Sequence, residues 1–302
     1  MKIFYLWQIV KLARMPIVLA VIPIFLVGVL FALRIGAEFS LGNFLWGFSI
    51  LFIIEIAASF ANDYFDYEAD KYNKQFGFSG GSGVLLNYPE LRPFAKWSSV
   101  FMFIFAIILT GIFVIISSFS PWIIAYIAVA VFFCWFYTAP PLRFVYRGIG
   151  ELPHMLAGVM FPGWGYLILT GTISLELLVF AIPFGLLGLT VILNFEIPDM
   201  EADINGGKQN LIVRKGRFFS FITIMTLYLA AFIFFLVFSY TSWFNTPINL
   251  WAITLISSVP LLVSIIPVTK RIVQREHATK YAIRNAKAGF LAVILIAFIL
   301  LM

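Results

Sequence analysis

The sequence predicts an all-α integral membrane protein with nine transmembrane helices, on two observations. Hydrophobic residues make up 62% of the 302 residues, and charged residues only 11%, against roughly 25% in soluble domains. Apolar runs long enough to cross a bilayer recur along the whole chain. These runs cover approximately residues 16–33, 39–61, 97–119, 121–139, 149–170, 174–196, 218–240, 249–269 and 286–302.

We expect residues 1–302 to form a single polytopic domain. The first apolar run is not followed by a small-residue cleavage site, so we interpret it as a retained helix rather than a signal peptide. The one cysteine, Cys134, lies inside an apolar run. Because it has no second cysteine to pair with, the sequence excludes disulfides and cysteine-based metal sites.

Basic residues alternate between the predicted loops. Of the 20 Lys and Arg residues, all except Arg34 precede the first helix or follow the second, fourth, sixth and eighth. By the positive-inside rule, the N-terminus and these loops are cytoplasmic and the C-terminus lies outside the cell membrane. The net charge of +6 therefore reflects topology, and we expect membrane lipids but no nucleic acid as partners.

The most basic loop lies between residues 270 and 287. A segment of this kind is able to bind anionic lipid or a protein partner. Ordinary topology signalling explains the same charges equally well. Both interpretations stay open from the sequence.

Two similar acidic motifs follow predicted helices on the cytoplasmic side. In the first motif Asn62, Asp66 and Asp70 are spaced four residues apart, which places their side chains on one helical face. The second motif runs from Asp199 to Asp203 and repeats the first almost residue for residue, DMEAD after DYEAD. Such a repeat at two helix ends indicates a shared function.

Magnesium is the metal ion that these residue types favour. Hard cations prefer carboxylate and amide oxygens, and Mg²⁺ usually binds through a few carboxylates together with substrate phosphates. We therefore predict two Mg²⁺ ions that bridge a diphosphate, the first on Asn62, Asp66 and Asp70. The second would lie on Asp199 and Asp203, with Asn194 as a further candidate ligand.

Two other interpretations of the acids stay open. In the first, the acids only cap helix ends and face water. In the second, they form the ion or proton sites of a transporter. Transporters usually place such groups near the bilayer midplane, whereas these motifs lie at helix ends. Deeper polar residues keep the transporter alternative open, namely Glu55, Glu151, His154 and Glu196.

The motifs resemble those of the UbiA superfamily of intramembrane aromatic prenyltransferases. The two acidic motifs are similar to the family's two Asp-rich motifs, and the segment Tyr137–Arg143 is similar to its Tyr-x-x-Pro-Pro-x-Arg/Lys segment. Arg14-x-Pro16 and the segment from Lys208 to Arg214 also match. The resemblance covers essentially the whole chain. It implies nine helices around a central cavity, with cytoplasmic cap loops that carry the Asp-rich motifs.

The resemblance also implies a reaction. A polyprenyl group would be transferred from an allylic diphosphate to an acceptor through an allylic carbocation, with Mg²⁺ required and diphosphate released. The motifs look most like those of the menaquinone branch, whose acceptor is 1,4-dihydroxy-2-naphthoate. The second motif also resembles archaeal members that prenylate lipids such as geranylgeranylglyceryl phosphate. Both an aromatic and a lipid acceptor stay open.

Further side chains are candidates for this reaction. Tyr137 would stabilise a cation or orient the diphosphate. Glu55, seven residues before Asn62 and near the same helical face, is a candidate for assisting the acceptor. Asp63 lies off the shared face, so we expect it to support or cap the motif. The diphosphate would be bound by basic side chains, for which the candidates are Lys208, Arg143, Arg214 and Lys74.

Overall fold

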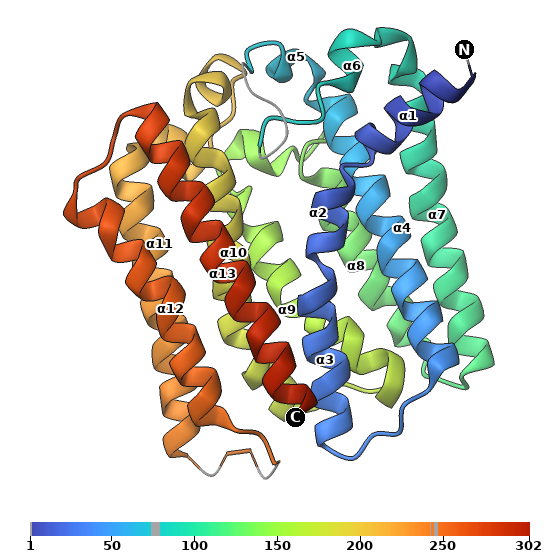
Figure 1. The fold of residues 1–302 in the computed structure, drawn as a ribbon. Coiled ribbons are helices and arrows are strands. Elements are labelled where there is room, and N and C mark those ends of the chain that lie inside the picture. Colours follow the sequence, from blue (N-terminus) through green and yellow to red (C-terminus); the bar gives the residue numbers. More distant parts are fainter. Residues whose placement is uncertain (1, 74–78, 242, 245–246) are drawn as a thin grey trace. The chain divides into compact units, whose positions relative to one another are not determined.

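A computed structural model of the protein describes residues 2–73, 79–241, 243–244 and 247–302 (Figure 1). All regular elements in these ranges are helices, which confirms the predicted fold class. Two of them are short 3-10 helices, η1 (Pro89–Leu91) and η2 (Phe144–Arg147). The α-helices are α1 (Lys2–Leu12), α2 (Met15–Ala20), α3 (Ile22–Arg34), α4 (Leu41–Phe65), α5 (Tyr67–Asp70), α6 (Val84–Asn87), α7 (Arg92–Ile116), α8 (Trp122–Phe136), α9 (Glu151–Thr170), α10 (Leu175–Asn205), α11 (Leu211–Tyr240), α12 (Leu250–Thr269) and α13 (Arg275–Leu301).

The helices identify a multi-pass membrane protein. In the described ranges, eight candidate spans are long and apolar enough to cross a bilayer, the first running from Tyr5 to Arg34. The predicted span 121–139 corresponds to α8, which has only 15 residues. At about 1.5 Å per residue, α8 is shorter than a hydrocarbon core of roughly 30 Å. The count of nine spans, their orientation and the central cavity therefore stay predictions.

The contacts divide the chain into two compact units that interleave along the sequence. The first unit consists of Met1–Ala20, Leu41–Gly150 and Glu201–Asn210. The second unit consists of Val21–Ser40, Glu151–Met200 and Leu211–Met302. The organisation of residues 1–302 as a single domain stays a prediction.

In the first unit α4 is the central element. It packs against α7 and α8, and α1 and α2 also contact it (Figure 1). The chain changes direction between α1 and α2 at Arg14, which has a φ of 51°; Pro16 follows, and its ring removes a backbone N–H. A small apolar cluster that includes Leu12, Phe60 and Val84 joins α1, α4 and α6. This packing holds the end of α4, where the first acidic motif begins.

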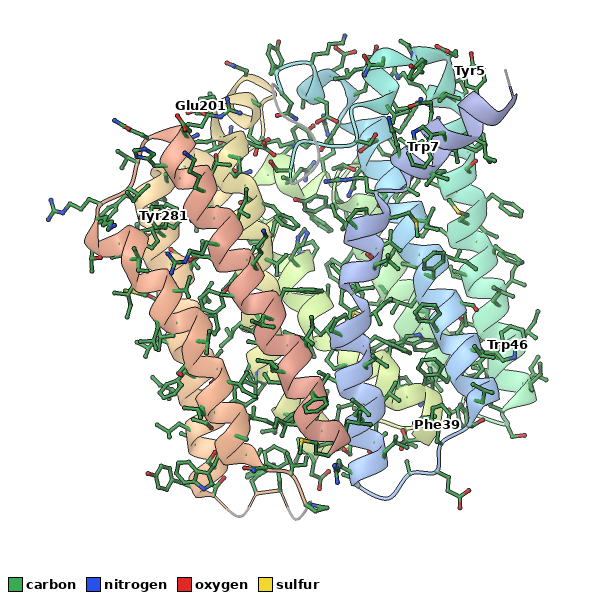
Figure 2. The ribbon with its side chains drawn as sticks, viewed as in Figure 1. Tyr5, Trp7, Phe39, Trp46, Glu201 and Tyr281 are labelled. Atoms are coloured by element: carbon green, nitrogen blue, oxygen red, sulfur yellow. The ribbon has the colours of Figure 1, made fainter. Side chains whose placement is uncertain are left out.

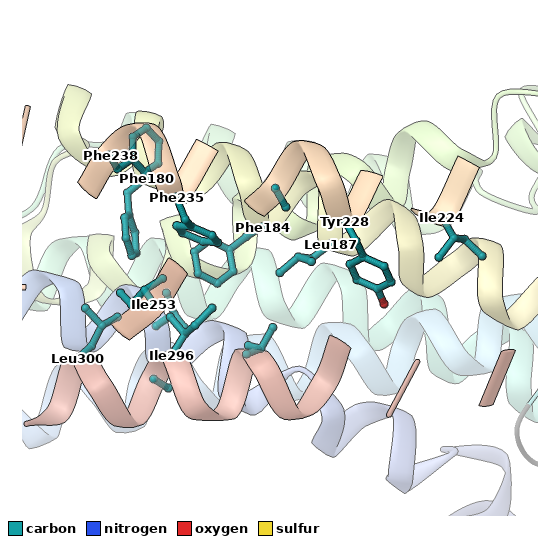
Figure 3. Close-up of a cluster of buried hydrophobic side chains, with 14 of the residues drawn as sticks. Phe180, Phe184, Leu187, Ile224, Tyr228, Phe235, Phe238, Ile253, Ile296 and Leu300 are labelled. Carbon is teal, nitrogen blue, oxygen red and sulfur yellow. The ribbon is translucent and has the colours of Figure 1, made fainter. Parts of the chain in front are cut away.

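In the second unit a core of aromatic side chains joins the helices. Phe180 and Phe184 of α10 lie against Phe235 of α11 (Figure 3). Small residues allow the backbones to approach closely, because an added methyl group at Gly158 would overlap the carbonyl of Phe184 and one at Gly165 that of Phe25. These two glycines therefore serve helix packing, as in other membrane proteins.

Candidate functional site

The first acidic motif continues the helical pattern beyond the end of α4. The amide of Asp66 donates to the carbonyl of Asn62 at 2.9 Å, and the amide of Asp70 to that of Asp66 at 2.8 Å. These bonds keep the helical register through Asp66, whose φ of −87° and ψ of 2° interrupt the helix, and the shared face of the three side chains stays a prediction. Asp66 and Asp70 are buried. Asn62 Oδ1 accepts a hydrogen bond from Thr138 Oγ1 at 3.1 Å.

Lys208 joins the two acidic motifs within the first unit. Its Nζ lies 3.0 Å from Asp66 Oδ2 and 3.3 Å from Asp203 Oδ1. The Lys208 side chain is 14% exposed, and those of Asp66 and Asp203 are 10% and 6% exposed. Asn210 Nδ2 donates to the other oxygen of Asp203 at 2.7 Å. One buried cation thus bridges a carboxylate from each motif.

The glycine-rich segment after the first motif lies directly on its acids. Asp63 is buried and accepts hydrogen bonds from the amide of Ser82 at 3.1 Å and from the Ser82 hydroxyl. Gly81 has a φ of 75°, and a Cβ there would lie 2.5 Å from Asp70 Oδ2. Because of this conformation and this contact, a side chain at position 81 would be strained. Asp63 therefore supports the site by anchoring this loop.

The charges of the site are strongly perturbed. Burial, together with the neighbouring Asp66 carboxylate, raises the pKa of Asp70 to about 8. Burial by itself would lower the pKa of Lys208, but the carboxylates of Asp66 and Asp203 raise it well above its ordinary value. Lys208 is therefore a permanent cation.

A turn after α8 brings an aromatic and a basic side chain to the same carboxylate. Tyr146 Oη donates to Asp66 Oδ1 at 2.8 Å. The Arg143 guanidinium lies 3.7 Å from the centre of the Tyr146 ring, a cation–π contact. Arg143 has a φ of 45°, and its Nε is buried with no hydrogen-bond partner in the described chain. Tyr146 is not among the residues predicted for the site, although its three-residue spacing from Arg143 is visible in the sequence.

Backbone hydrogen bonds fix this turn. The amide of Val145 donates to the carbonyl of Tyr137 at 3.1 Å, and the amide of Gln209 donates to the carbonyl of Val145 at 3.0 Å. The second bond ties the turn to the segment that carries Lys208. Tyr137 interacts electrostatically with Lys208, so the structure places this predicted residue at the site.

Other predicted residues belong to the second unit. Asn194 is fully buried and its Nδ2 donates to the carbonyl of Thr190 at 2.8 Å, while its Oδ1 has no partner in the described chain. Asp199 is buried on the same helix. Arg214 is half-exposed and lies 4.0 Å from Glu151. The roles of Asn194, Asp199 and Arg214 in the site stay predictions, and Lys74 lies outside the described residues.

The remaining acids have simpler environments. Glu68 is exposed and pairs with Lys71 at 2.7 Å, and Glu201 is exposed at the end of α10 (Figure 2). Glu151 Oε1 accepts a hydrogen bond from the amide of Leu211 at 2.5 Å and so caps the start of α11. Glu55 on α4 is partly buried and interacts electrostatically with Cys134 of α8. Its assistance to an acceptor stays a prediction.

The chemistry of the donor set fits magnesium. In the described ranges no group of three or more His, Cys, Asp or Glu side chains is arranged to hold a metal ion. Nevertheless, the buried carboxylates of Asp66 and Asp203 share the Lys208 cation, and Asp70, whose pKa is raised by burial and by the Asp66 carboxylate, is also buried. Oxygen ligands of this kind are those that Mg²⁺ prefers.

A model of the UbiA prenyltransferase family matches residues 20–294. The chain belongs to the UbiA prenyltransferase family. The match spans both units and confirms the resemblance drawn from the acidic motifs.

Among relatives, the chain is similar to the 1,4-dihydroxy-2-naphthoate octaprenyltransferase of Bacillus subtilis (strain 168). The two are 28% identical over 170 residues, which is 56% of this chain and 53% of that protein. The match therefore spans about half the length of this curated relative.

Two solved structures share the fold over nearly their whole length. A UbiA homologue from Archaeoglobus fulgidus bound to DMAPP and Mg²⁺ has a TM-score of 0.66 at 16% identity, covering 95% of this chain and 99% of that one. A structure of a digeranylgeranylglyceryl phosphate synthase has a TM-score of 0.66 at 18% identity, covering 97% of both chains. At these identities the similarity shows the fold alone.

Proposed function

We propose that this protein is a Mg²⁺-dependent prenyltransferase that moves a polyprenyl group from an allylic diphosphate to 1,4-dihydroxy-2-naphthoate. The observation that carries the proposal is the Lys208 bridge between Asp66 and Asp203, because it joins both acidic motifs around one concentrated charge. The similarity to a 1,4-dihydroxy-2-naphthoate octaprenyltransferase supports the aromatic acceptor. The similarity to a structure bound to DMAPP and Mg²⁺ supports the diphosphate and the metal.

The acids would hold two metal ions. Asn62, Asp66 and Asp70 are the ligands proposed for the first, and Asp199 and Asp203, with Asn194, for the second. When bound, the metal neutralises the negative charge that develops on a departing diphosphate. The site would face the cytoplasm, where soluble diphosphates are found.

Lys208 has two functions in this proposal. In the site as described it compensates Asp66 and Asp203. When cations and a diphosphate enter, its ammonium group would turn from these carboxylates to the phosphate oxygens, which are stronger anionic partners. Further phosphate ligands in the proposal are Arg143, Arg214 and Lys74. The Nε of Arg143 has no hydrogen-bond partner in the described chain, so its N–H is available to donate to a phosphate oxygen.

The aromatic side chains orient the charged groups. The hydroxyl of Tyr146 holds one oxygen of Asp66, so the other is left for Lys208 or a metal. Tyr137, close to Lys208, would face the carbocation with its ring. As the allylic C–O bond breaks, its electron pair leaves with the diphosphate. An electron-rich carbon of the acceptor then attacks the cation, and the group displaced from that carbon, a proton or, at the carboxylate-bearing carbon, CO2, leaves as the ring regains its aromaticity. Glu55 would assist the acceptor.

The test is a transfer assay on the purified protein with Mg²⁺ and radiolabelled geranylgeranyl diphosphate. Parallel reactions contain 1,4-dihydroxy-2-naphthoate, hydroxybenzoate or geranylgeranylglyceryl phosphate, each with and without EDTA. We expect a prenylated naphthoate product that EDTA abolishes. A product only with the glycerol phosphate would assign the lipid acceptor instead. Substrate-dependent ion flux in liposomes, without any product, would favour the transporter.

A further inference from the structure

A basic hollow lies in the second unit where α12 ends and α13 begins. It has a volume of about 560 Å³ and is lined by Lys270, Ile272, His277, Lys280, Tyr281 and Arg284. Figure 2 shows Tyr281 beside the turn that connects the two helices. None of these residues belongs to the acidic motifs or to the proposed reaction.

Local structure explains why these side chains meet. His277, Lys280 and Arg284 are spaced three and four residues apart on α13, which places them on one helical face. Lys270 is the C-cap of α12. The next residue, Arg271, has a φ of 47°, a left-handed conformation that ends the helix. The turn therefore brings a cation from α12 to a basic face of α13.

The charges in the hollow are poorly compensated. Lys280 pairs with Glu276 at 2.8 Å, but both side chains are largely exposed, at 68% and 80%, so this pair is weak. Lys270 and Arg284 form no ion pair with any residue that the structure describes. Three cations and one acid leave the hollow with a local charge of about +2. An anion would relieve this repulsion.

One side of the hollow is apolar. Ile272 and Tyr281 are half-buried and pack against the hydrophobic core of the second unit. The hollow thus combines a basic rim with an apolar wall. This combination matches a phosphate group that is attached to hydrocarbon, because the hydrocarbon can pack against the apolar wall. A free phosphate ion would gain nothing from contact with that wall.

We propose that this hollow binds the headgroup phosphate of an anionic phospholipid. Topology signalling requires only that basic residues lie on one side of the membrane. It does not require that they converge on a single hollow beside two apolar side chains. The convergence of these basic side chains therefore predicts a specific binding site, which the number of charges in residues 270–287 does not. Phospholipid binding at this site is independent of prenyl transfer.

The test compares two variants that remove the same charge from the same segment. Lys270→Gln with Arg284→Gln removes two cations from the hollow. Arg271→Gln with Lys287→Gln removes two exposed cations outside it and is the matched control. Thermal unfolding of the full chain in detergent micelles is followed during titration with dioleoylphosphatidylglycerol, with dioleoylphosphatidylcholine, or with inorganic phosphate.

For the unmodified protein we expect stabilisation by phosphatidylglycerol and not by phosphatidylcholine. The half-saturating phosphatidylglycerol concentration should rise about tenfold in the hollow variant and stay within about twofold in the control. Equal rises in both variants would overturn the proposal in favour of general surface charge. Stabilisation by inorganic phosphate at similar concentrations would overturn the lipid assignment. If the double variant is unstable, Arg284→Gln alone gives the same comparison against Lys287→Gln.

Discussion

Replacing Lys208 by Met should destabilise the protein strongly, because it removes the one cation between two buried carboxylates. At 3.0 and 3.3 Å, each pair has a Coulomb attraction of about 5 kcal/mol for an effective dielectric constant of about 20. The burial of the charges offsets much of this attraction. Removal of one partner from a buried pair therefore costs about 3–5 kcal/mol, and we expect a loss of unfolding free energy in this range.

The assay is unfolding by sodium dodecyl sulfate in mixed micelles, with and without Mg²⁺. Met keeps most of the length of the Lys side chain and leaves Asp66 and Asp203 uncompensated. Because a cation is then more favourable between them, Mg²⁺ should stabilise the Lys208→Met variant more than the unmodified protein. A saturating metal at about 100 times its dissociation constant contributes about 2.7 kcal/mol.

Lys71→Met is the matched control. Lys71 pairs with Glu68 at 2.7 Å, but the two side chains are 48% and 75% exposed, so its removal should lower the unfolding free energy far less than Lys208→Met does. If Lys208→Met cost no more than Lys71→Met, and Mg²⁺ affected both variants equally, the bridge would not be the contact that organises the acidic motifs. The reasoning behind the proposed site would then fail.

Four further outcomes test the site. Tyr146→Phe removes a 2.8 Å hydrogen bond to Asp66 but keeps the aromatic ring that contacts Arg143. The Mg²⁺ concentration for half-maximal transfer should therefore rise about tenfold, and an unchanged Mg²⁺ titration would contradict this role of Tyr146. Asp66→Ala and Asp199→Ala should each abolish transfer in protein that remains folded in the membrane, and full activity in either would end the metal hypothesis. Glu55→Gln should reduce turnover at saturating acceptor, whereas normal kinetics would remove Glu55 from the site. Because the pKa of Asp70 is about 8, a proton competes with the metal ion for this carboxylate below that pH. The affinity for Mg²⁺ should therefore rise with pH up to about 8 and then level off. The Asp70→Asn variant should lose this pH dependence.

Some of these conclusions were available from sequence alone. The low charge content and the recurrent apolar runs indicate a helical membrane protein, because a soluble fold has no place for so much apolar surface. The four-residue spacing of Asn62, Asp66 and Asp70 depends only on helix geometry, and the hydrogen bonds of the structure preserve it. The nature of the acidic motifs, and with it the family, was therefore predictable.

The tertiary structure decided which distant residues meet. Tyr146 and Lys208 lie far from Asp66 in sequence, and no periodicity links residues that a loop brings together. The same holds for Gly81, whose close approach to Asp70 depends on how the loop folds back. The sequence determined the helices and their acidic ends because each follows from neighbouring residues. The partner of each acid was decided by long-range packing, which local spacing does not encode.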